Sequence, residues 1–510
     1  MKKLLLCLMG GVLAHTQIFA QQAPIVVATV TEKITPSSPA TGTPAATPPT
    51  VKLPEVPPAE QKVTVYGFVR NDIFLNSRRN LDLRDGVLDV YPLDATNLPT
   101  RSGTTLTANP NDDANAVPQL GYSAIVTRLG VRMGGITAFD AKISGVLETD
   151  FFGITNGTGG SGSGTENLLR LRHAYAAMDW TKSQLLIGQY WNPNFIPKCF
   201  PGTANFSTGI PFNPFSFIPQ VRLTSKVGKD ISLMGMIFGY SLAGFSPAGT
   251  FAVGSGVDAQ KFSVLPAFAS QLTFENKTFL ASVGLEGNSL SPRIMDTKNT
   301  STGVFGGTGA GNVQKNISSN LFMLNFLAYA KLTTSKVTAK FHTTYGQSYT
   351  QYVGLGGFAE YRNANTGEWK YEAHNQMNMW GELISTNSKK FQPAIFIGYL
   401  QNMGLANSIA ASNIKSGTLA FQGRGISTVT GRTFDNMLRI APRLDFYSGK
   451  MKLALEYELS MMKWADVQGL IPTADGSLPT TVDFKAGTAD NARPFTATNS
   501  RLAAVMAYNF

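Results

Sequence analysis

The chain has 510 residues, with 43 Lys and Arg against 32 Asp and Glu, which gives a formal net charge of +11. Charged residues make up only 15 % of the chain and aromatic residues 10 %, which excludes a disordered chain and is unusual for a soluble protein, where about a quarter of residues are charged. Apart from a short stretch at the start, there is no run of about twenty apolar residues, which excludes a helical membrane protein. A β-barrel built for a membrane fits what remains.

The first twenty residues have the three parts of a secretory signal peptide. Met1, Lys2 and Lys3 give a basic start, residues 4–14 are apolar, and Ala20 supplies the small residue at the cleavage position. We therefore expect residues 1–20 to be removed on export. That would leave Cys199 as the one cysteine, so no disulfide could form within the chain.

Residues 21–61 differ from the rest of the chain, since they are rich in Pro, Thr, Ala and Val. Proline lacks a backbone N–H and fixes φ, so we expect this stretch to be an extended, disordered periplasmic segment. A semi-rigid spacer that reaches toward the cell wall is the alternative, and the sequence leaves both open.

From residue 62 to residue 510, apolar side chains recur at every second position, as they do along half-buried strands. In residues 451–460, for example, Met, Leu, Leu, Tyr and Leu alternate with Lys, Ala, Glu, Glu and Ser. A soluble sandwich would also alternate, so the pattern predicts strands without specifying the fold.

Short links and long links between these strands alternate along the chain. Outer-membrane barrels place tight turns on the periplasmic side and long loops outside. The links therefore predict an all-β chain forming a transmembrane antiparallel β-barrel of about sixteen strands over residues 62–510. The short links are 135–139, 179–183, 227–230, 275–277, 333–336, 386–390 and 447–450, and the long links lie near 77–120, 153–166, 193–217, 244–261, 290–318, 351–371, 404–431 and 465–497.

The chain ends on an alternating stretch whose last residue is Phe510. Such an ending resembles the assembly signal of outer-membrane barrels. Phe is common in this chain, at 32 residues, so the ending supports a barrel only together with the signal peptide and the pattern of links.

Seven short segments stand in a fairly specific order: 65–70 (VYGFVR), 127–131 (TRLGV), 169–175 (LRLRHAY), 186–191 (LIGQYW), 200–203 (FPGT), 211–215 (PFNPF) and 219–224 (PQVRLT). Together they resemble the outer-membrane porins of the DcaP-like group, in the form found in Bacteroidetes-type bacteria. The resemblance covers about the first third of the predicted barrel. It implies a pore, and a trimer, for small and often anionic solutes. Some relatives carry a helical segment before the barrel where this chain is Pro-rich, so trimerisation through such a segment is not implied.

Strand alternation assigns charged side chains in strand interiors to the lumen, because a Lys or Arg facing lipid costs about 2–4 kcal/mol at the midplane. Twelve bases and eight acids are expected to point inward, an excess of +4. Eight of the bases are predicted to line the pore: Arg70, Arg128, Arg132, Lys142, Arg170, Arg172, Arg439 and Arg443. The other inward charges are Arg222, Lys340, Lys452, Arg501, Asp72, Glu148, Asp150, Glu286, Glu382, Asp445, Glu456 and Glu458.

Two neighbouring strands each present a pair of arginines, Arg128 with Arg132 and Arg170 with Arg172. Guanidinium groups along one wall could pass an anion from one to the next. A structural role is the alternative, with the arginines pairing to acids on the strand between them.

The third long link, residues 193–217, contains many prolines and phenylalanines and no acidic residue. Long exposed loops are rarely so apolar, so we expect this loop to fold into the barrel and narrow it. The alternative is a lid packed outside at a trimer contact. The predicted constriction residues are Phe195, Lys198, Phe200, Phe206, Phe212 and Phe215.

Signals for an enzyme are poor. His173, His342 and His374 are the histidines left after export, and His173 falls on the lipid-facing parity of its strand. No Cys/His spacing suits a metal, and the glycine-rich residues 157–164 lack the Lys-Ser/Thr ending of a phosphate loop. We expect no enzymatic activity, no cofactor, no metal site and no nucleic-acid partner.

The sequence favours a passive diffusion porin of a Gram-negative outer membrane, with modest preference for anions. The partners expected are membrane lipid, two further copies in a homotrimer, and small anionic or neutral solutes. The alternative is an outer-membrane receptor or adhesin whose barrel is closed and whose outer loops bind a partner.

Overall fold

The computed structural model describes residues 62–153, 167–240, 252–253, 256–306, 311–317, 319–347, 349–427, 432–471, 477, 479–487 and 492–510. The predicted signal peptide, the Pro-rich segment 21–61 and the glycine-rich residues 157–164 lie outside this part of the chain.

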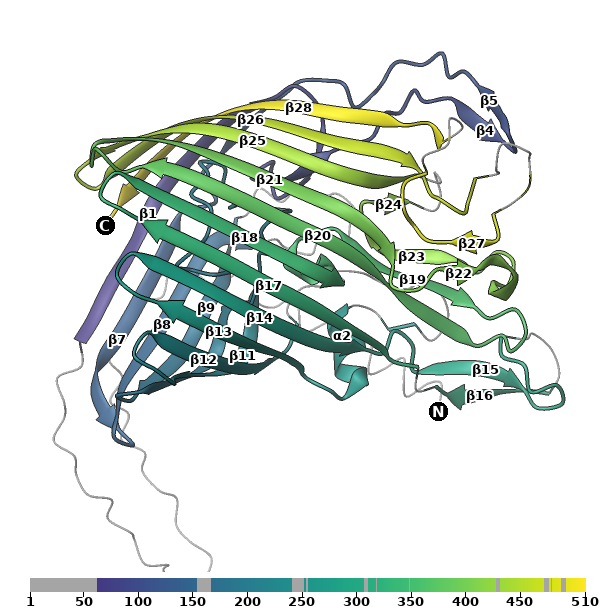
Figure 1. Ribbon diagram of the computed structural model, residues 1–510, viewed down its shortest axis with the longest axis horizontal. Coiled ribbons are helices and arrows are strands. Elements are labelled where there is room, and N and C mark those ends of the chain that lie inside the picture. The colour runs from purple at the N-terminus through teal and green to yellow at the C-terminus, as the bar shows by residue number, and fades with distance from the viewer. Residues whose placement is uncertain are drawn as a thin grey trace, which may run out of the picture. The chain divides into compact units, whose positions relative to one another are not determined.

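A closed antiparallel β-barrel of sixteen strands is the core of the structure (Figure 1). The fold predicted from alternation and link length is therefore confirmed. In chain order the sixteen strands are β1 (Lys62–Asn76), β7 (Arg128–Ala138), β8 (Ala141–Gly153), β9 (Leu168–Asp179), β10 (Ser183–Trp191), β11 (Phe217–Lys226), β12 (Ile231–Phe238), β13 (Ala267–Glu275), β14 (Phe279–Leu290), β17 (Leu321–Thr333), β18 (Val337–Gln347), β20 (Trp369–Ser385), β21 (Phe391–Leu405), β25 (Arg432–Ser448), β26 (Met451–Asp466) and β28 (Phe495–Asn509).

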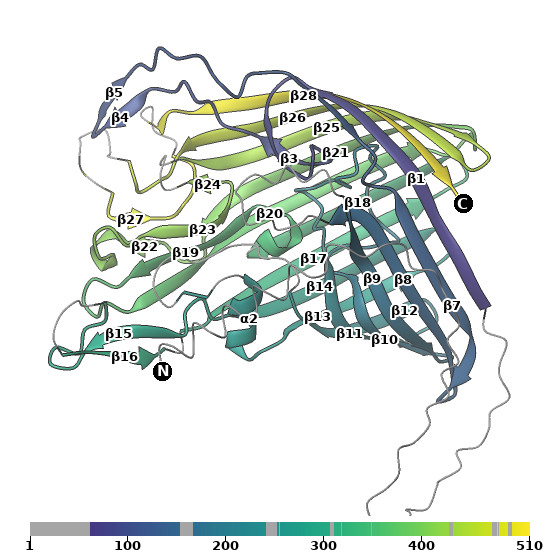
Figure 2. The same ribbon diagram turned by 180° about the vertical axis from the view of Figure 1, so that it is seen from behind.

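Strand β1 closes the barrel, because it pairs with β28 along one edge and with β7 along the other. Phe68 lies opposite Asn509 in the first pairing and opposite Arg128 in the second. Every other spanning strand pairs with the strands before and after it, which leaves no unpaired edge in the ring (Figures 1 and 2). A closed ring satisfies the backbone groups that lipid cannot satisfy.

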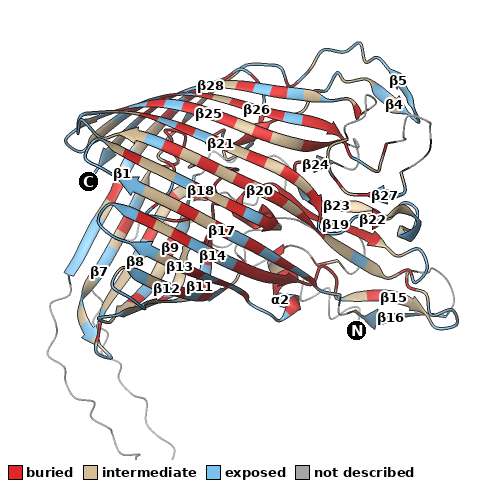
Figure 3. Ribbon diagram, in the orientation of Figure 1, coloured by how far each residue is buried: buried red, intermediate tan, exposed pale blue. Residues whose placement is uncertain are grey.

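The spanning strands present apolar side chains outward and polar ones inward. On β26, Leu453, Leu455 and Tyr457 are exposed, whereas Glu456 and Glu458 between and beside them are buried. Figure 3 shows this alternation of buried and exposed positions along the strands. Such an outer face is built to contact hydrocarbon. No helix within the described residues is long and apolar enough to cross a membrane.

The long links carry additional structure, most of which gathers at one end of the barrel (Figure 1). Strand β6 (Gln119–Ser123) pairs with β1, while β19 (Gly356–Arg362) bridges β20 and β23. The remaining elements are β2 (Asn80–Leu83), β3 (Leu88–Pro92), β4 (Thr100–Ser102), β5 (Thr105–Thr107), α2 (Gly256–Ser263), β15 (Met295–Asn299), β16 (Asn312–Asn316), η1 (Thr350–Tyr352), β22 (Ile409–Ala410), η2 (Ala411–Asn413), β23 (Ala420–Arg424), β24 (Ile426–Ser427) and β27 (Thr481–Val482).

A continuous hydrophobic core joins two of the long links to the inner face of the strands. The link after β10 contributes Phe195, Phe206 and Phe212, and the link after β1 contributes Val87 and Val90. The sequence predicted the first of these loops to fold inward but treated the second as an ordinary outer link. The structure therefore adds a second inward segment.

Candidate functional site

The loop 193–217 is bound to inner side chains of the wall along much of its length. Near its start, Asn194 donates its side-chain N–H to Glu286 of β14, and its carbonyl is 3.0 Å from Nε2 of His342 on β18. In its middle, the Gly202 N–H donates to Glu382 of β20 at 2.9 Å. Near its end, Phe215 donates its N–H to the carbonyl of Tyr352 at 2.8 Å.

The segment around Lys198 reaches the end of the barrel where the short turns lie. The Lys198 ammonium pairs with Glu275 at 2.6 Å, at the turn between β13 and β14. Lys331, which lies near the next short turn, donates to the Lys198 carbonyl at 3.0 Å. The sequence predicted Lys198 as a constriction residue. Its side chain is largely exposed, and its charge is balanced by Glu275.

Most phenylalanines of the loop pack against other aromatic side chains. Phe195 stacks on Trp191 of β10 with ring centroids 3.6 Å apart, and Phe206 lies 5.0 Å from Phe152 of β8. Phe212 packs near Phe396 of β21 and is fully buried. Phe200 differs, since it remains 38 % exposed. Burial also raises the pKa of the Cys199 thiol in this loop to about 11.

The second inward segment is the hairpin of β2 and β3. Arg439 of β25 donates to the carbonyl of Val90, and Arg501 of β28 donates to that of Gly86. Asp89 lies between the same two arginines, at 3.8 and 3.9 Å, and is almost fully buried. The sequence carried a signal for this segment, because four of the five residues 87–91 are apolar or aromatic within a long polar link.

We call β7 to β11 the cationic wall. Here Arg170 pairs with Asp150 at 2.6 Å, and Arg172 pairs with Glu148 at 2.7 Å and with Asp150 at 3.1 Å. Arg128 is 3.6 Å from Glu148. These arginines thus make the ion pairs that a structural role requires. The inward charges predicted for this wall are the bases Arg128, Arg132, Lys142, Arg170, Arg172 and Arg222 and the acids Glu148 and Asp150, and the structure adds Asp179, which lies opposite Lys142.

A β-bulge on β9 changes which side chains point inward. Glu148 of β8 lies opposite His173, but the next residue of β8 lies opposite Leu171, so Arg172 is an extra residue in the ladder. Arg172 and His173 are consequently both buried. The predicted lipid-facing position of His173 is wrong for this reason, since the bulge shifts the parity of the strand by one residue. His173 packs instead among Tyr190, Trp191 and Phe217.

Three bases of the cationic wall have no carboxylate within 4.0 Å among the described residues: Arg132, Lys142 and Arg222. Arg132 lies over the ring of Tyr66 at 4.6 Å, and Arg222 lies over that of Tyr190 at 5.4 Å. Arg132 and Lys142 are exposed. The excess positive charge of the barrel therefore collects on this wall, close to aromatic rings.

We call β14 to β28 together with β1 the balanced wall. Arg443 pairs with Glu382 and Asp445, and Arg439 pairs with Glu458. The side chains of Arg439, Arg443 and Arg172 are at most 2 % exposed. A solute in the lumen could not contact them. The inward charges predicted for this wall are Arg70, Lys340, Arg439, Arg443, Lys452, Arg501, Asp72, Glu286, Glu382, Asp445, Glu456 and Glu458.

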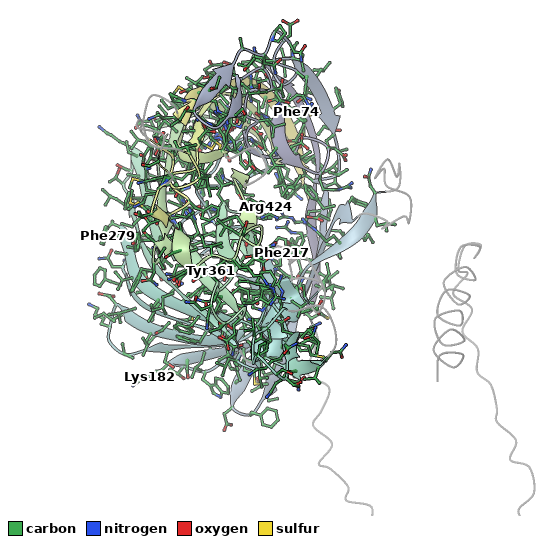
Figure 4. The ribbon with its side chains drawn as sticks, turned by 90° about the vertical axis from the view of Figure 1, so that its right-hand side faces the viewer. Phe74, Lys182, Phe217, Phe279, Tyr361 and Arg424 are labelled. Carbon is green, nitrogen blue, oxygen red and sulfur yellow. The ribbon has the colours of Figure 1, made fainter. Side chains whose placement is uncertain are left out.

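Acids and bases inside the barrel differ in how far they are exposed. Each of the eight carboxylates predicted to point inward has a side chain at most 8 % exposed. Several bases are more open, with Arg170 at 29 %, Lys452 at 25 % and Arg128 at 20 %. Figure 4 views the barrel from the side at right in Figure 1 and labels Phe217 and Arg424 inside the ring of strands. The accessible charge of the lumen is therefore mainly positive.

The other two histidines have structural contacts. His342 is buried and stacked on Trp380, and His374 is buried with its Nε2 2.8 Å from the amide oxygen of Asn402. Among the described residues, no group of three or more His, Cys, Asp and Glu side chains could hold a metal ion.

No family model matches the chain, and no curated protein matches it. Among solved structures, it is similar to the outer membrane channel DcaP of Acinetobacter baumannii, with 15 % identity, a TM-score of 0.53, and coverage of 88 % of this chain and 97 % of that one. It is less similar to OmpT of Vibrio cholerae, with 8 % identity and a TM-score of 0.44, over 88 % of this chain and 98 % of that one. OmpF of Salmonella typhi gives 11 % identity and a TM-score of 0.40, over the same two shares of the chains. The first likeness shows the fold.

Proposed function

We propose that this chain is a passive diffusion porin of a Gram-negative outer membrane, for small hydrophilic solutes and with a modest preference for anions. The observation that carries the proposal is the difference in exposure inside the barrel, where bases are accessible and carboxylates are covered. The sixteen-stranded barrel with an apolar outer face supplies the path through the membrane. Arg70, Arg128, Arg132, Lys142 and Arg170 are the side chains we assign to the pore lining.

Within this proposal, the loop 193–217 is the constriction. Its hydrogen bonds to β14, β18 and β20 support this role, because they hold it across the space that the strands enclose. Its buried phenylalanines fill part of that space. The proposed narrowing residues are Phe195, Phe200, Phe206, Phe212 and Phe215, with Lys198 at the short-turn end.

The direct test is single-channel recording in planar bilayers, with the reversal potential measured in a salt gradient. The proposal predicts stepwise conductance and a reversal potential on the anion side. A heat-denatured sample is the control. A correctly folded protein that produced no steps would contradict the porin proposal, and a reversal potential on the cation side would contradict the anion preference.

We further propose that three copies assemble through the wall of β10 to β13. These strands have only 8 to 10 residues, whereas β20 and β25 have 17. A spanning strand needs about 9–11 residues, so this side offers the lowest apolar band to lipid. Its exposed Ile187, Val221 and Ile237 would pack against a neighbour. Replacing Val221 by Asp should give monomers in analytical ultracentrifugation, while Val283→Asp, on β14, should leave the assembly intact.

A closed receptor or adhesin is the second candidate, and the hairpin of β2 and β3 favours it. This hairpin adds a second inward segment beside the loop 193–217, with Val87, Val90 and Tyr91 buried in the common core. The same bilayer recording separates the two functions, because a plugged barrel gives no steps until the hairpin is removed.

A further inference from the structure

The loop 193–217 contains no acidic residue, yet it is a partner of several acids of the wall. Its donors are backbone N–H groups and asparagine side chains, which no regular secondary structure engages. Hydrogen bonds from such donors to a carboxylate are charge-assisted and short. The pairs are Asn194 Nδ2 with Glu286, Gly202 N with Glu382 at 2.9 Å, Ala204 N and Asn205 N with Glu456 at 2.8 and 2.9 Å, and Asn205 Nδ2 with Glu458 at 3.2 Å.

The short stretch 202–205 accounts for three of these four acids. Glu382, Glu456 and Glu458 come from β20 and β26, and their side chains are at most 2 % exposed. The wall strands alone do not enclose these carboxylates, because each has at least one oxygen bonded to the loop. The loop therefore acts as a cover over the acids.

The bases that touch the same loop are covered less completely. Lys340 donates to the carbonyl of Phe200 and Arg70 donates to that of Ala204, yet their side chains remain 12 % and 15 % exposed. Arg439, which donates to the carbonyl of Ile210, is the buried exception. The loop thus contacts four buried acids, Glu286 included, and one buried base, whereas Lys331, Lys340 and Arg70 are buried less completely.

From these contacts we infer that residues 202–205 are a specificity-determining segment, which produces the anion preference by covering Glu382, Glu456 and Glu458. This inference rests on the proposed porin function and goes beyond narrowing. A loop that only narrowed the pore would strengthen whatever preference the wall already had. A loop that covers acids decides the sign of the charge that a solute meets, because charges within about 8–10 Å act on it at moderate salt.

The test uses the full chain and a variant that lacks residues 202–207. Both are treated with a water-soluble carbodiimide and an amine, and the modified carboxylates are located by peptide mass spectrometry. Glu382, Glu456 and Glu458 should react in the variant and not in the full chain. Glu275, which is 44 % exposed, should react in both, and Glu148, which Arg172 covers, should react in neither.

In bilayers, the variant should show larger conductance and a reversal potential shifted toward cations at low salt. Asn205→Ala removes the side-chain donor to Glu458 without shortening the loop or adding a charge. It should shift the reversal potential in the same direction with conductance nearly unchanged, and it replaces the deletion if that variant fails to assemble. Labelling of the three acids in the full chain would overturn the inference, as would labelling in the variant with an unmoved reversal potential. Absence of conductance steps in the full chain would contradict the porin function instead.

Discussion

The two walls of the barrel use the same residue types for different tasks. Of the inward charges predicted from the sequence, the balanced wall carries six bases and six acids, whereas the cationic wall carries six bases and two acids. On the balanced wall, Arg439 and Arg443 are enclosed by carboxylates. On the cationic wall, Arg132 and Lys142 form no ion pair within 4.0 Å among the described residues and stay exposed, although Asp179 lies opposite Lys142 in the ladder. An arginine inside a barrel therefore acts structurally or electrostatically according to how many acids surround it.

The largest effect is expected when a buried, acid-paired arginine is removed from the cationic wall. Arg172→Ala leaves Glu148 and Asp150 with fewer partners in a buried place, and breaking a buried pair costs about 3–5 kcal/mol. We expect a loss of that size in the free energy of unfolding, measured by urea titration in lipid vesicles. Arg132→Ala is the control, since Arg132 is exposed and lies over the ring of Tyr66, and its loss should cost about 0.5–1 kcal/mol. Equal losses for the two variants would show that burial does not separate the two kinds of arginine.

The next variant removes the exposed charge. Arg132→Glu combined with Lys142→Glu changes the charge of the cationic wall by four units. The reversal potential should move toward cations at 0.01 M salt, where screening acts over about 30 Å, and much less at 1 M, where it acts over about 3 Å. The control is Lys389→Glu combined with Lys390→Glu, which makes the same change of charge in a short turn. It should change the reversal potential little. A shift that persisted at 1 M would point to a change in pore structure.

The smallest expected effect concerns pH and the hairpin of β2 and β3, whose Asp89 faces Arg439 and Arg501 of the balanced wall. Burial, opposed by Arg501 and assisted by Glu458, raises the pKa of Asp89 to about 7. Between its ordinary value near 4 and about 7, the folded protein holds a proton that the unfolded chain lacks, so stability falls as the pH rises through this window. Asp89→Asn removes the effect, so the variant should gain thermal stability relative to the natural protein as the pH is raised from 4.5 to 7.5. A constant difference in Tm over this range would show that Asp89 does not titrate there.

The sequence was sufficient for the fold because two independent patterns agreed. Alternation marked the strands, and the sorting of links by length gave their number and order. The turns at 179–183 and 447–450, for example, lie between consecutive paired strands. These features are local, so a single sequence shows them.

The candidate site was less accessible to prediction. The residues around Arg172 do not by themselves indicate a β-bulge. A residue is extra only relative to the register of its partner strand, which here is β8. Likewise, which acid encloses which arginine depends on contacts across the barrel, such as Arg443 of β25 with Glu382 of β20. The inward hairpin was different, since the concentration of apolar and aromatic residues at 87–91 gave the same kind of signal that identified the loop 193–217.

The bulge at Arg172 has a consequence for how such a barrel can change over evolutionary time. On either side of it, β9 keeps its pairing, with Arg170 opposite Asp150 before the bulge and Tyr175 opposite Val146 after it. One inserted codon therefore adds a charged side chain to the interior without moving its neighbours to the lipid face. Loss of the same codon would return the strand to regular alternation. The charge inside the barrel can thus be altered one residue at a time while the membrane-facing surface is conserved.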